Sequence, residues 1–231
     1  MTAFDIALWG ILPYIALTVF VVGHIWRWRV DQFGWNTHTT QLLESRWLRI
    51  GSPLFHFGLL AVLLGHVIGL LIPKSWTAAV GISEGAYHAL AGGVGTLAGI
   101  AMTVGLALLI ARRIVNGRVR RTTTRMDAVM YIVLVTVILT GMAQTVGVNL
   151  LGEGHDYRET VSVWFRGIFA LQPDTSLMTG IPLSYQLHAL SAWLLIGIWP
   201  FTRLVHAWSI PIGYLWRPYV IYRSRQVGSR T

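Results

Sequence analysis

The stretch S-P-L-F-H-F-G-L-L-A-V-L-L-G-H-V-I-G-L-L-I-P, residues 52–73, contains no Asp, Glu, Lys or Arg. Its length and apolarity are those of a helix that crosses a bilayer, which needs about 20 such residues. Two histidines, His56 and His66, nevertheless lie inside it. A second apolar stretch, residues 183–206, carries His188 and His206. Because ionisable side chains at membrane depth are costly and usually functional, these four imidazoles need an explanation.

The composition places the chain among integral membrane proteins. Of its 231 residues, 54% are hydrophobic and only 12% are charged, whereas soluble domains have about 25% charged residues. The chain has no cysteine, which excludes disulfides, thiolate-held iron–sulfur clusters, c-type haem attachment and cysteine zinc sites. The first apolar run has no basic segment before it and is longer than a signal-peptide core, so we expect a retained helix.

We predict an all-α integral membrane protein with five transmembrane helices in a single domain, residues 1–231. The predicted spans are residues 6–26, 52–73, 86–110, 127–150 and 181–206. In the third span, Gly95 and Gly99 form a G-x-x-x-G face that allows close helix approach. Thr124 and Asp127 predict a capping box at the start of the fourth span. Residues 160–169 predict a short interfacial helix before the fifth.

The basic residues are distributed very unevenly between the two sides of the predicted membrane. Fifteen Lys and Arg residues fall on one side, and three, Lys74, Arg158 and Arg166, fall on the other. The positive-inside rule therefore predicts that the N-terminus is outside and the C-terminus cytoplasmic. The net charge of +9 is then a topology signal and does not indicate nucleic-acid binding. The basic inner face would instead contact a cytoplasmic partner or anionic lipid.

A lone buried histidine is more often an interhelical hydrogen bond than a ligand. Four histidines paired across two spans favour haem iron ligation, because imidazole is a usual axial ligand and these spans lack carboxylates. The spans run in opposite directions, which pairs His66 with His188 near the outside and His56 with His206 near the cytoplasm. On regular helices the separations would be about 15 Å on one span and about 27 Å on the other. We expect tilt and a kink at Pro200 to absorb this difference.

Residues near these ligands have two explanations each. Arg112 and Arg203 at inner span ends are candidate contacts for haem propionates through bidentate hydrogen bonds, and anchoring at the membrane surface is the simpler explanation of either one. Gly58, Gly65 and Gly69 leave room either for a flat macrocycle or for ordinary helix packing.

The other histidines fit positions at or near the membrane surface. His88 follows Tyr87 at the outer start of the third span, at about the height of His66. It is a candidate for lining a quinol pocket, with a simple interfacial histidine as the alternative. We assign the remaining three to solvated or interfacial positions: His24, His38 and His155.

At this point the residues resemble those of a known family, the gamma subunit of membrane-bound respiratory nitrate reductase. The resemblance covers essentially the whole chain. The segments that carry it are residues 54–69, R-x-R-R-T-T-T at 118–124, Y-Q-L-H at 185–188 and F-T-R-L-V-H-A-W-S-I-P-I-G-Y-L at 201–215. The last segment is the most specific, because a generic b-type cytochrome is not expected to share it.

The resemblance implies a quinol dehydrogenase subunit of the prokaryotic inner membrane, with two haem b groups. It would oxidise menaquinol or ubiquinol near the outer side and release the protons there. Electrons would pass through the outer and then the inner haem to a cytoplasmic iron–sulfur beta subunit and a molybdenum-containing alpha subunit that reduces nitrate. The implied quinol pocket comprises Gly65, Glu84, Tyr87 and His88. The family leads us to expect a basic residue where this chain has Glu84.

Other functions also fit part of the pattern. A dihaem anchor of a different cytoplasmic reductase, such as a heterodisulfide-reductase-like complex, would carry the same haems, and neighbouring genes would distinguish it. A transporter with a histidine proton relay would bind no haem and would be expected to use intramembrane carboxylates. A structural anchor would bind no cofactor at all.

Overall fold

The computed structural model describes residues 2–152, 154–209 and 216, and every regular element within them is helical. The predicted all-α class is therefore confirmed for this part of the chain. The α-helices are α1 (Ala3–Ile6), α2 (Leu12–Val30), α3 (Arg46–His66), α4 (Lys74–Ala79), α5 (Glu84–Val115), α6 (Gly117–Arg120), α7 (Arg125–Met142), α8 (Val161–Phe169) and α9 (Leu183–Ile198). The π-helices are η1 (Ala7–Ile11), η3 (Val67–Leu71) and η4 (Ala143–Leu150). The 3₁₀ helices are η2 (Gln32–Gly34), η5 (Thr175–Met178), η6 (Trp199–Phe201) and η7 (Arg203–Trp208). Outside the described residues lie positions 210–215 of the 201–215 segment and four basic residues counted in the predicted inner tail: Arg217, Arg223, Arg225 and Arg230.

Four helical stretches are long and apolar enough to cross a membrane. They are Ala3–Val30, Arg46–Leu71, Glu84–Val115 and Arg125–Leu150. They coincide with the first four predicted spans, and each begins earlier than predicted. The apolar pattern marks only the part of a helix that lies in hydrocarbon, whereas the backbone hydrogen bonds continue through the polar residues at its ends.

The predicted span 181–206 is not one continuous helix. α9 ends at Ile198, η6 follows, and Thr202 is extended with φ −113° and ψ 176°. His206 lies beyond this break, on η7. Pro200 explains the end of α9, because it has no N–H to donate to the carbonyl four residues earlier. The expected kink at Pro200 is therefore a break in the helix, and the separation of about 27 Å calculated for a regular helix does not apply to His188 and His206.

Two local predictions hold in the structure. Asp127 N donates to Thr124 Oγ1 at 3.1 Å and Thr124 N donates to Asp127 Oδ2 at 3.0 Å, which confirms the capping box. The predicted helix at 160–169 is also observed, as α8. It is packed into the core: Trp164 and Ile168 are each 1% exposed, and Trp164 Nε1 donates to the Trp9 carbonyl at 2.8 Å.

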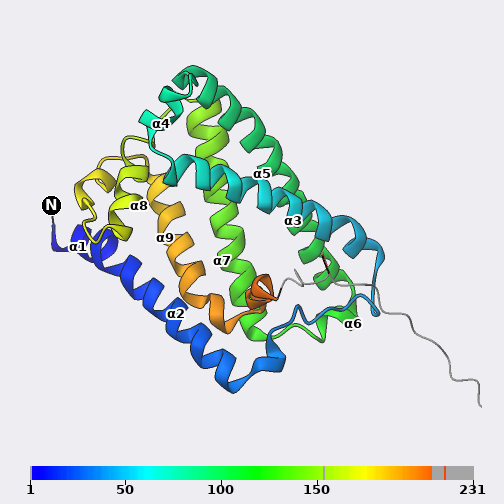
Figure 1. The fold of residues 1–231 in the computed structure, drawn as a ribbon. Coiled ribbons are helices and arrows are strands. Elements are labelled where there is room, and N and C mark those ends of the chain that lie inside the picture. The colour runs from blue at the N-terminus through cyan, green and yellow to red at the C-terminus, as the bar shows by residue number, and fades with distance from the viewer. Residues whose placement is uncertain (1, 153, 210–215, 217–231) are drawn as a thin grey trace, which may run out of the picture.

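Glycines let the backbones of α3 and α5 touch. A Cβ at Gly105 of α5 would lie 2.3 Å from Phe55 N, and a Cβ at Gly58 of α3 would lie 2.6 Å from Met102 N. Real Cβ contacts are never that short, so only glycine fits at either place. Gly58 therefore serves helix packing, and α3 lies along α5 as Figure 1 shows.

The G-x-x-x-G face of α5 makes a second close approach. A Cβ at Gly99 would lie 2.3 Å from Met142 Sδ of α7, whereas one at Gly95 would meet Thr145 Cγ2 at an ordinary 3.7 Å. The predicted close approach is thus confirmed at Gly99.

The histidine-bearing helices belong to different hydrophobic clusters. α9 lies between α2 and α7 (Figure 1). One cluster is built from α9, α8 and the N-terminal helices, and its buried members are Trp9, Ala16, Trp164, Ile168, Met178, Ile181, Tyr185 and Trp193. The other is built from α3, α5 and α7, and its buried members are Phe55, Met102, Leu106, Leu134 and Ile138. The histidines face each other where these two parts of the molecule meet.

Candidate functional site

The four histidines form two pairs. The ring centroids of His66 and His188 are 5.9 Å apart, and those of His56 and His206 are 6.1 Å apart. α3 supplies one member of each pair, while α9 and η7 supply the others. Since ten residues separate the two histidines of α3, the pairs are about 15 Å apart along that helix. The two pairs are those expected from the opposite directions of the spans.

Each of these four imidazoles has its Nδ1 next to a backbone carbonyl oxygen. The distances are 2.8 Å from His56 to Ser52, 2.8 Å from His66 to Val62, 3.0 Å from His188 to Val137 and 2.6 Å from His206 to Arg203. A carbonyl oxygen only accepts, so every Nδ1 must carry the hydrogen and every Nε2 keeps its lone pair. This is how proteins orient imidazoles that bind metals through Nε2.

α7 forms the wall behind His188. A Cβ at Gly141 would lie 3.0 Å from His188 Cε1, and Thr140 Oγ1 lies 3.3 Å from His188 Nδ1. The sequence analysis did not include these α7 residues in the site. The only signal for them was a small residue next to a hydroxyl in an apolar span, which is common in membrane helices.

Arg203 is tied to Asp127 of α7. Its Nε and Nη2 donate to the two carboxylate oxygens at 2.7 Å each, in a bidentate pair. Asp127 is buried, with 5% exposure. This pair attaches the start of η7, and therefore the helix that carries His206, to α7. The Arg203 guanidinium, a candidate contact for a haem propionate, therefore has the Asp127 carboxylate as its partner.

Arg112 also has protein partners. Its Nε donates to Glu44 Oε2, its Nη1 donates to Thr40 Oγ1 at 2.8 Å, and its Nη2 donates to the carbonyls of Thr40 and Glu44. The guanidinium is 3% exposed. Arg112 thus fixes the loop between α2 and α3 against the C-terminal end of α5, and all of its donors have protein partners.

Replacing Arg203 with glutamine is expected to lower the free energy of unfolding by about 3 kcal/mol, because Asp127 would be left as a buried, unpaired charge. Thermal denaturation in detergent measures the loss. Arg29→Gln is the matched control, since Arg29 is exposed and has no side-chain partner among the described residues. Equal melting midpoints for the two variants would show that the pair does not stabilise the fold.

Charged residues gather at the other end of the molecule, which the sequence analysis expects to be the outer one, in an outer charged cluster made of Lys74, Glu84, Asp156, Arg158 and Glu159. Lys74 Nζ lies 2.7 Å from Asp156, 2.6 Å from Glu159 and 3.7 Å from Glu84. Arg158 is 2% exposed, and its Nη1 lies 3.3 Å from Glu84. The basic charge expected at the start of the third span is therefore supplied by Lys74 and Arg158, which both face Glu84.

Three of the four quinol-pocket candidates lie in or beside this cluster: Glu84, Tyr87 and His88. Glu84 and His88 are 3.8 Å apart on α5, and the Tyr87 ring lies 4.0 Å below the Arg158 guanidinium. A Cβ at Gly65 would meet no atom within 4 Å. One helical turn further, a Cβ at Gly69 would lie 3.0 Å from Tyr87 Oη, which links the end of the His66 helix to the candidates on α5.

Three members of this region also have the spacing of metal ligands. Glu84, His88 and Asp156 offer ligand atoms within 4.8 Å of one another. The Lys74 ammonium lies next to both carboxylates, so the negative charge of the group is already balanced. We therefore assign the group to ion pairing.

The cluster predicts an acid-sensitive outer loop. Burial alone would raise the pKa of Asp156, but hydrogen bonds from Lys74 and from the Arg158 backbone hold it below its usual 3.8. A lowered folded-state pKa contributes stability that is present above 3.8 and is lost as the pH falls through the folded value. The protection factor of residues 154–160, which is the intrinsic exchange rate divided by the observed rate at the same pH, should fall between about pH 5 and about pH 3. Asp156→Asn should show low protection at both pH values, and an unchanged protection factor in the parent protein would contradict the assignment.

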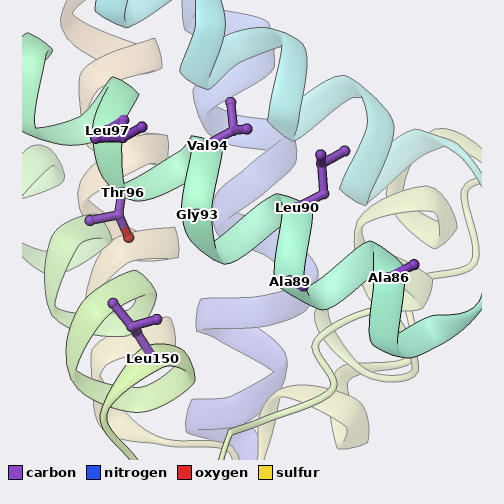
Figure 2. A pocket seen from close by; sticks show the side chains of 8 residues that line it. All are labelled: Ala86, Ala89, Leu90, Gly93, Val94, Thr96, Leu97 and Leu150. Atoms are coloured by element: carbon purple, nitrogen blue, oxygen red, sulfur yellow. The ribbon is translucent and has the colours of Figure 1, made fainter.

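A shallow apolar groove of about 640 Å³ lies elsewhere on α5. Figure 2 shows its lining, which is Ala86, Ala89, Leu90, Gly93, Val94, Thr96 and Leu97 of α5 with Leu150 of η4. None of the predicted site residues lines it, and at 100° per residue its centre faces away from Glu84 and His88. The histidine pairs, and not this groove, are the candidate site.

Comparison with known proteins shows to which family this chain belongs. A family model described as the nitrate reductase gamma subunit matches residues 5–225. The chain is 55% identical over 219 residues to nitrate reductase-like protein NarX of Mycobacterium tuberculosis, which covers 94% of this chain but only 34% of that protein. It is 48% identical over 218 residues to the nitrate reductase gamma chain of Bacillus subtilis, with 94% and 97% of the two chains covered. It is 32% identical over 223 residues to the respiratory nitrate reductase 2 gamma chain of Escherichia coli, with 96% and 98% covered. The chain therefore belongs to the nitrate reductase gamma subunit family.

Proposed function

We propose that this chain is the quinol-oxidising dihaem cytochrome b subunit of a respiratory nitrate reductase, and that it passes electrons from the outer to the inner side of the membrane. The proposal rests on two pairs of facing imidazoles, His66 with His188 and His56 with His206. Every one of them has its Nδ1 bonded to a carbonyl and its Nε2 available.

The spacing of the pairs fits a metal ion between the rings. An imidazole nitrogen binds a metal at about 2.0 Å, so two rings on opposite sides of one ion have centroids roughly 6 Å apart. The centroid distances of 5.9 Å and 6.1 Å agree with this value. His66 and His188 would hold the outer haem b, and His56 and His206 the inner one. Each haem would supply one-electron transfer at its iron.

The quinol would be oxidised beside the outer pair, near Gly65, Glu84, Tyr87 and His88. Its protons would be accepted by His88 and by Glu84, which belongs to the outer charged cluster. His188 is held by α7, so the outer ligand set stays fixed while quinol binds. We give Arg112 and Arg203 no propionate, because their donors bind protein oxygens.

The orientation follows from charge. We propose a single transmembrane domain with five spans, α9 with η6 providing the fifth, and with the N-terminus outside. The inner face would then bear the basic loops, facing a cytoplasmic iron–sulfur subunit that feeds a molybdenum-containing one. The names of the relatives, two of them gamma chains of nitrate reductases, support this partner class.

The test is a haem count per chain with a reduced-minus-oxidised spectrum, on the full chain purified in detergent from cells supplied with haem. We expect two low-spin b-type haems per chain. One haem would mean that one histidine pair is not a ligand set. No haem would contradict the proposal and favour proton relay or helix packing for the histidines.

A further inference from the structure

The helix that carries His206 is held by contacts outside itself. η7 has six residues and is separated from α9 by the extended Thr202. Short 3₁₀ helices have poorer hydrogen-bond geometry than α-helices, so their position depends on their neighbours. Arg203 attaches the first residue of η7 to α7. Its last residue, Trp208, is attached to α2.

His24 is the partner of Trp208. The Trp208 indole Nε1 donates to His24 Nε2 at 3.0 Å. The other ring nitrogen, His24 Nδ1, lies 2.6 Å from the Phe20 carbonyl one turn earlier on α2. A carbonyl only accepts and an indole N–H only donates, so both partners select the neutral imidazole with its hydrogen on Nδ1. His24 is thereby fixed as an acceptor that faces η7.

Aromatic rings flank the His24 imidazole. The ring centroids of Phe20, Trp35 and Trp208 lie 4.3, 5.7 and 6.0 Å from that of His24. They come from α2, from the residue after η2 and from η7, so His24 lies where three parts of the inner end meet. Ser209 Oγ adds a hydrogen bond to the Trp35 carbonyl at 2.8 Å. The rings and the two bonds leave the imidazole little freedom to rotate.

We propose that His24 is a positioning residue for the inner histidine pair, and that it acts through Trp208 on the orientation of the His206 imidazole. The proposal rests on the proposed function, because it takes the inner pair to be a haem ligand set. Trp208 follows His206 by two residues on the same short helix, so a shift of its indole moves the ligand. Groups that orient a metal ligand tune the properties of the metal.

The experiment uses the full chain, loaded with haem, in detergent. His24→Leu keeps the bulk and removes the acceptor, while His24→Gln offers an amide oxygen near the position of Nε2. We expect both variants to bind two haems. At a fixed ambient potential, the oxidised-to-reduced ratio of the inner haem should change measurably in His24→Leu, by up to about fivefold, which is the ratio that corresponds to one lost hydrogen bond. It should change less in His24→Gln, and the outer haem should not change in either.

Controls separate this role from packing. His38→Asn removes an exposed histidine from the neighbouring loop and should change neither haem. Trp208→Phe removes the donor but keeps a ring, so it should reproduce the shift, and combining it with His24→Leu should add little. Trp208→Phe alone also provides the measurement if His24→Leu does not fold.

An unchanged inner haem in the folded acceptor or donor variant would overturn the proposal. Equal shifts in His24→Leu and His24→Gln would do so too, since they would assign the effect to packing. A parent protein without haem is a different result, and it would refute the proposed function itself.

Discussion

Replacing His188 with alanine should leave a chain that binds one haem in place of two. Alanine removes Nε2, and neither Thr140 nor Gly141 on the α7 wall beside the ring has a side chain that normally binds haem iron. The inner pair lies about 15 Å away along α3 and should keep its haem. Haem per chain and the reduced-minus-oxidised spectrum measure the change, and reduction of the remaining haem by added quinol should fall at least about 100-fold.

His206→Ala is the counterpart on the inner side. It should also leave one haem, and the two spectra should differ and should sum to that of the parent. His155→Ala is the matched control, because His155 lies in the outer loop and contacts Thr160 and Tyr185 instead of another histidine. Two haems in both His188→Ala and His206→Ala would reject the ligand sets. Loss of the same spectral component in both would reject the pairing.

The pairing of the histidines was predictable because it depends only on the direction of each span. His56 precedes His66 in the chain, whereas their partners follow in the reverse order, with His188 beside His66 and His206 beside His56. The bilayer determines the length of each apolar span and the side on which Lys and Arg residues gather, and neither depends on the details of helix packing. The capping box and the helix α8 were predictable for a different reason, because both depend on local sequence alone.

The break before His206 was not predictable in its detail. Pro200 indicates that a helix is disturbed, but a proline can kink a helix or end it. The outcome depends on Arg27, 173 residues away in the sequence, whose Nη1 donates to the Pro200 carbonyl at 2.7 Å and to the Thr202 carbonyl at 2.9 Å. These bonds satisfy carbonyls that a continuous helix would have used internally.

The arginines show the same limit. A basic residue at an inner span end suits a propionate, a lipid phosphate or a protein carboxylate equally well. Arg112 is bonded to Glu44, 68 residues away, and Arg203 to Asp127, 76 residues away. Only the tertiary structure selects among such partners, which is why the sequence alone could not show that both guanidiniums bind protein carboxylates.

Gly105→Val should strongly impair folding, because it places a side chain where the backbones of α3 and α5 touch. The Cβ position lies 2.3 Å from Phe55 N and 2.7 Å from Phe55 Cα, and these are backbone atoms of α3 that cannot rotate away. The helices would have to separate, which opens the cluster around Phe55 and Met102. Overpacking of a core costs about 1–3 kcal/mol, and a clash with backbone belongs at or above the upper end.

The measurement is the yield of monodisperse protein in detergent and its melting midpoint. Gly92→Val is the matched control, because it places the same side chain on the same helix where a Cβ would meet nothing within 4 Å. The control should express and melt like the parent, which excludes the helix propensity of valine as the cause. Because α3 carries both His56 and His66, Gly105→Val should also lower the haem content at both levels together, unlike either ligand variant. Full haem content and an unchanged melting midpoint in Gly105→Val would mean that α3 and α5 do not meet as closely as the glycines indicate.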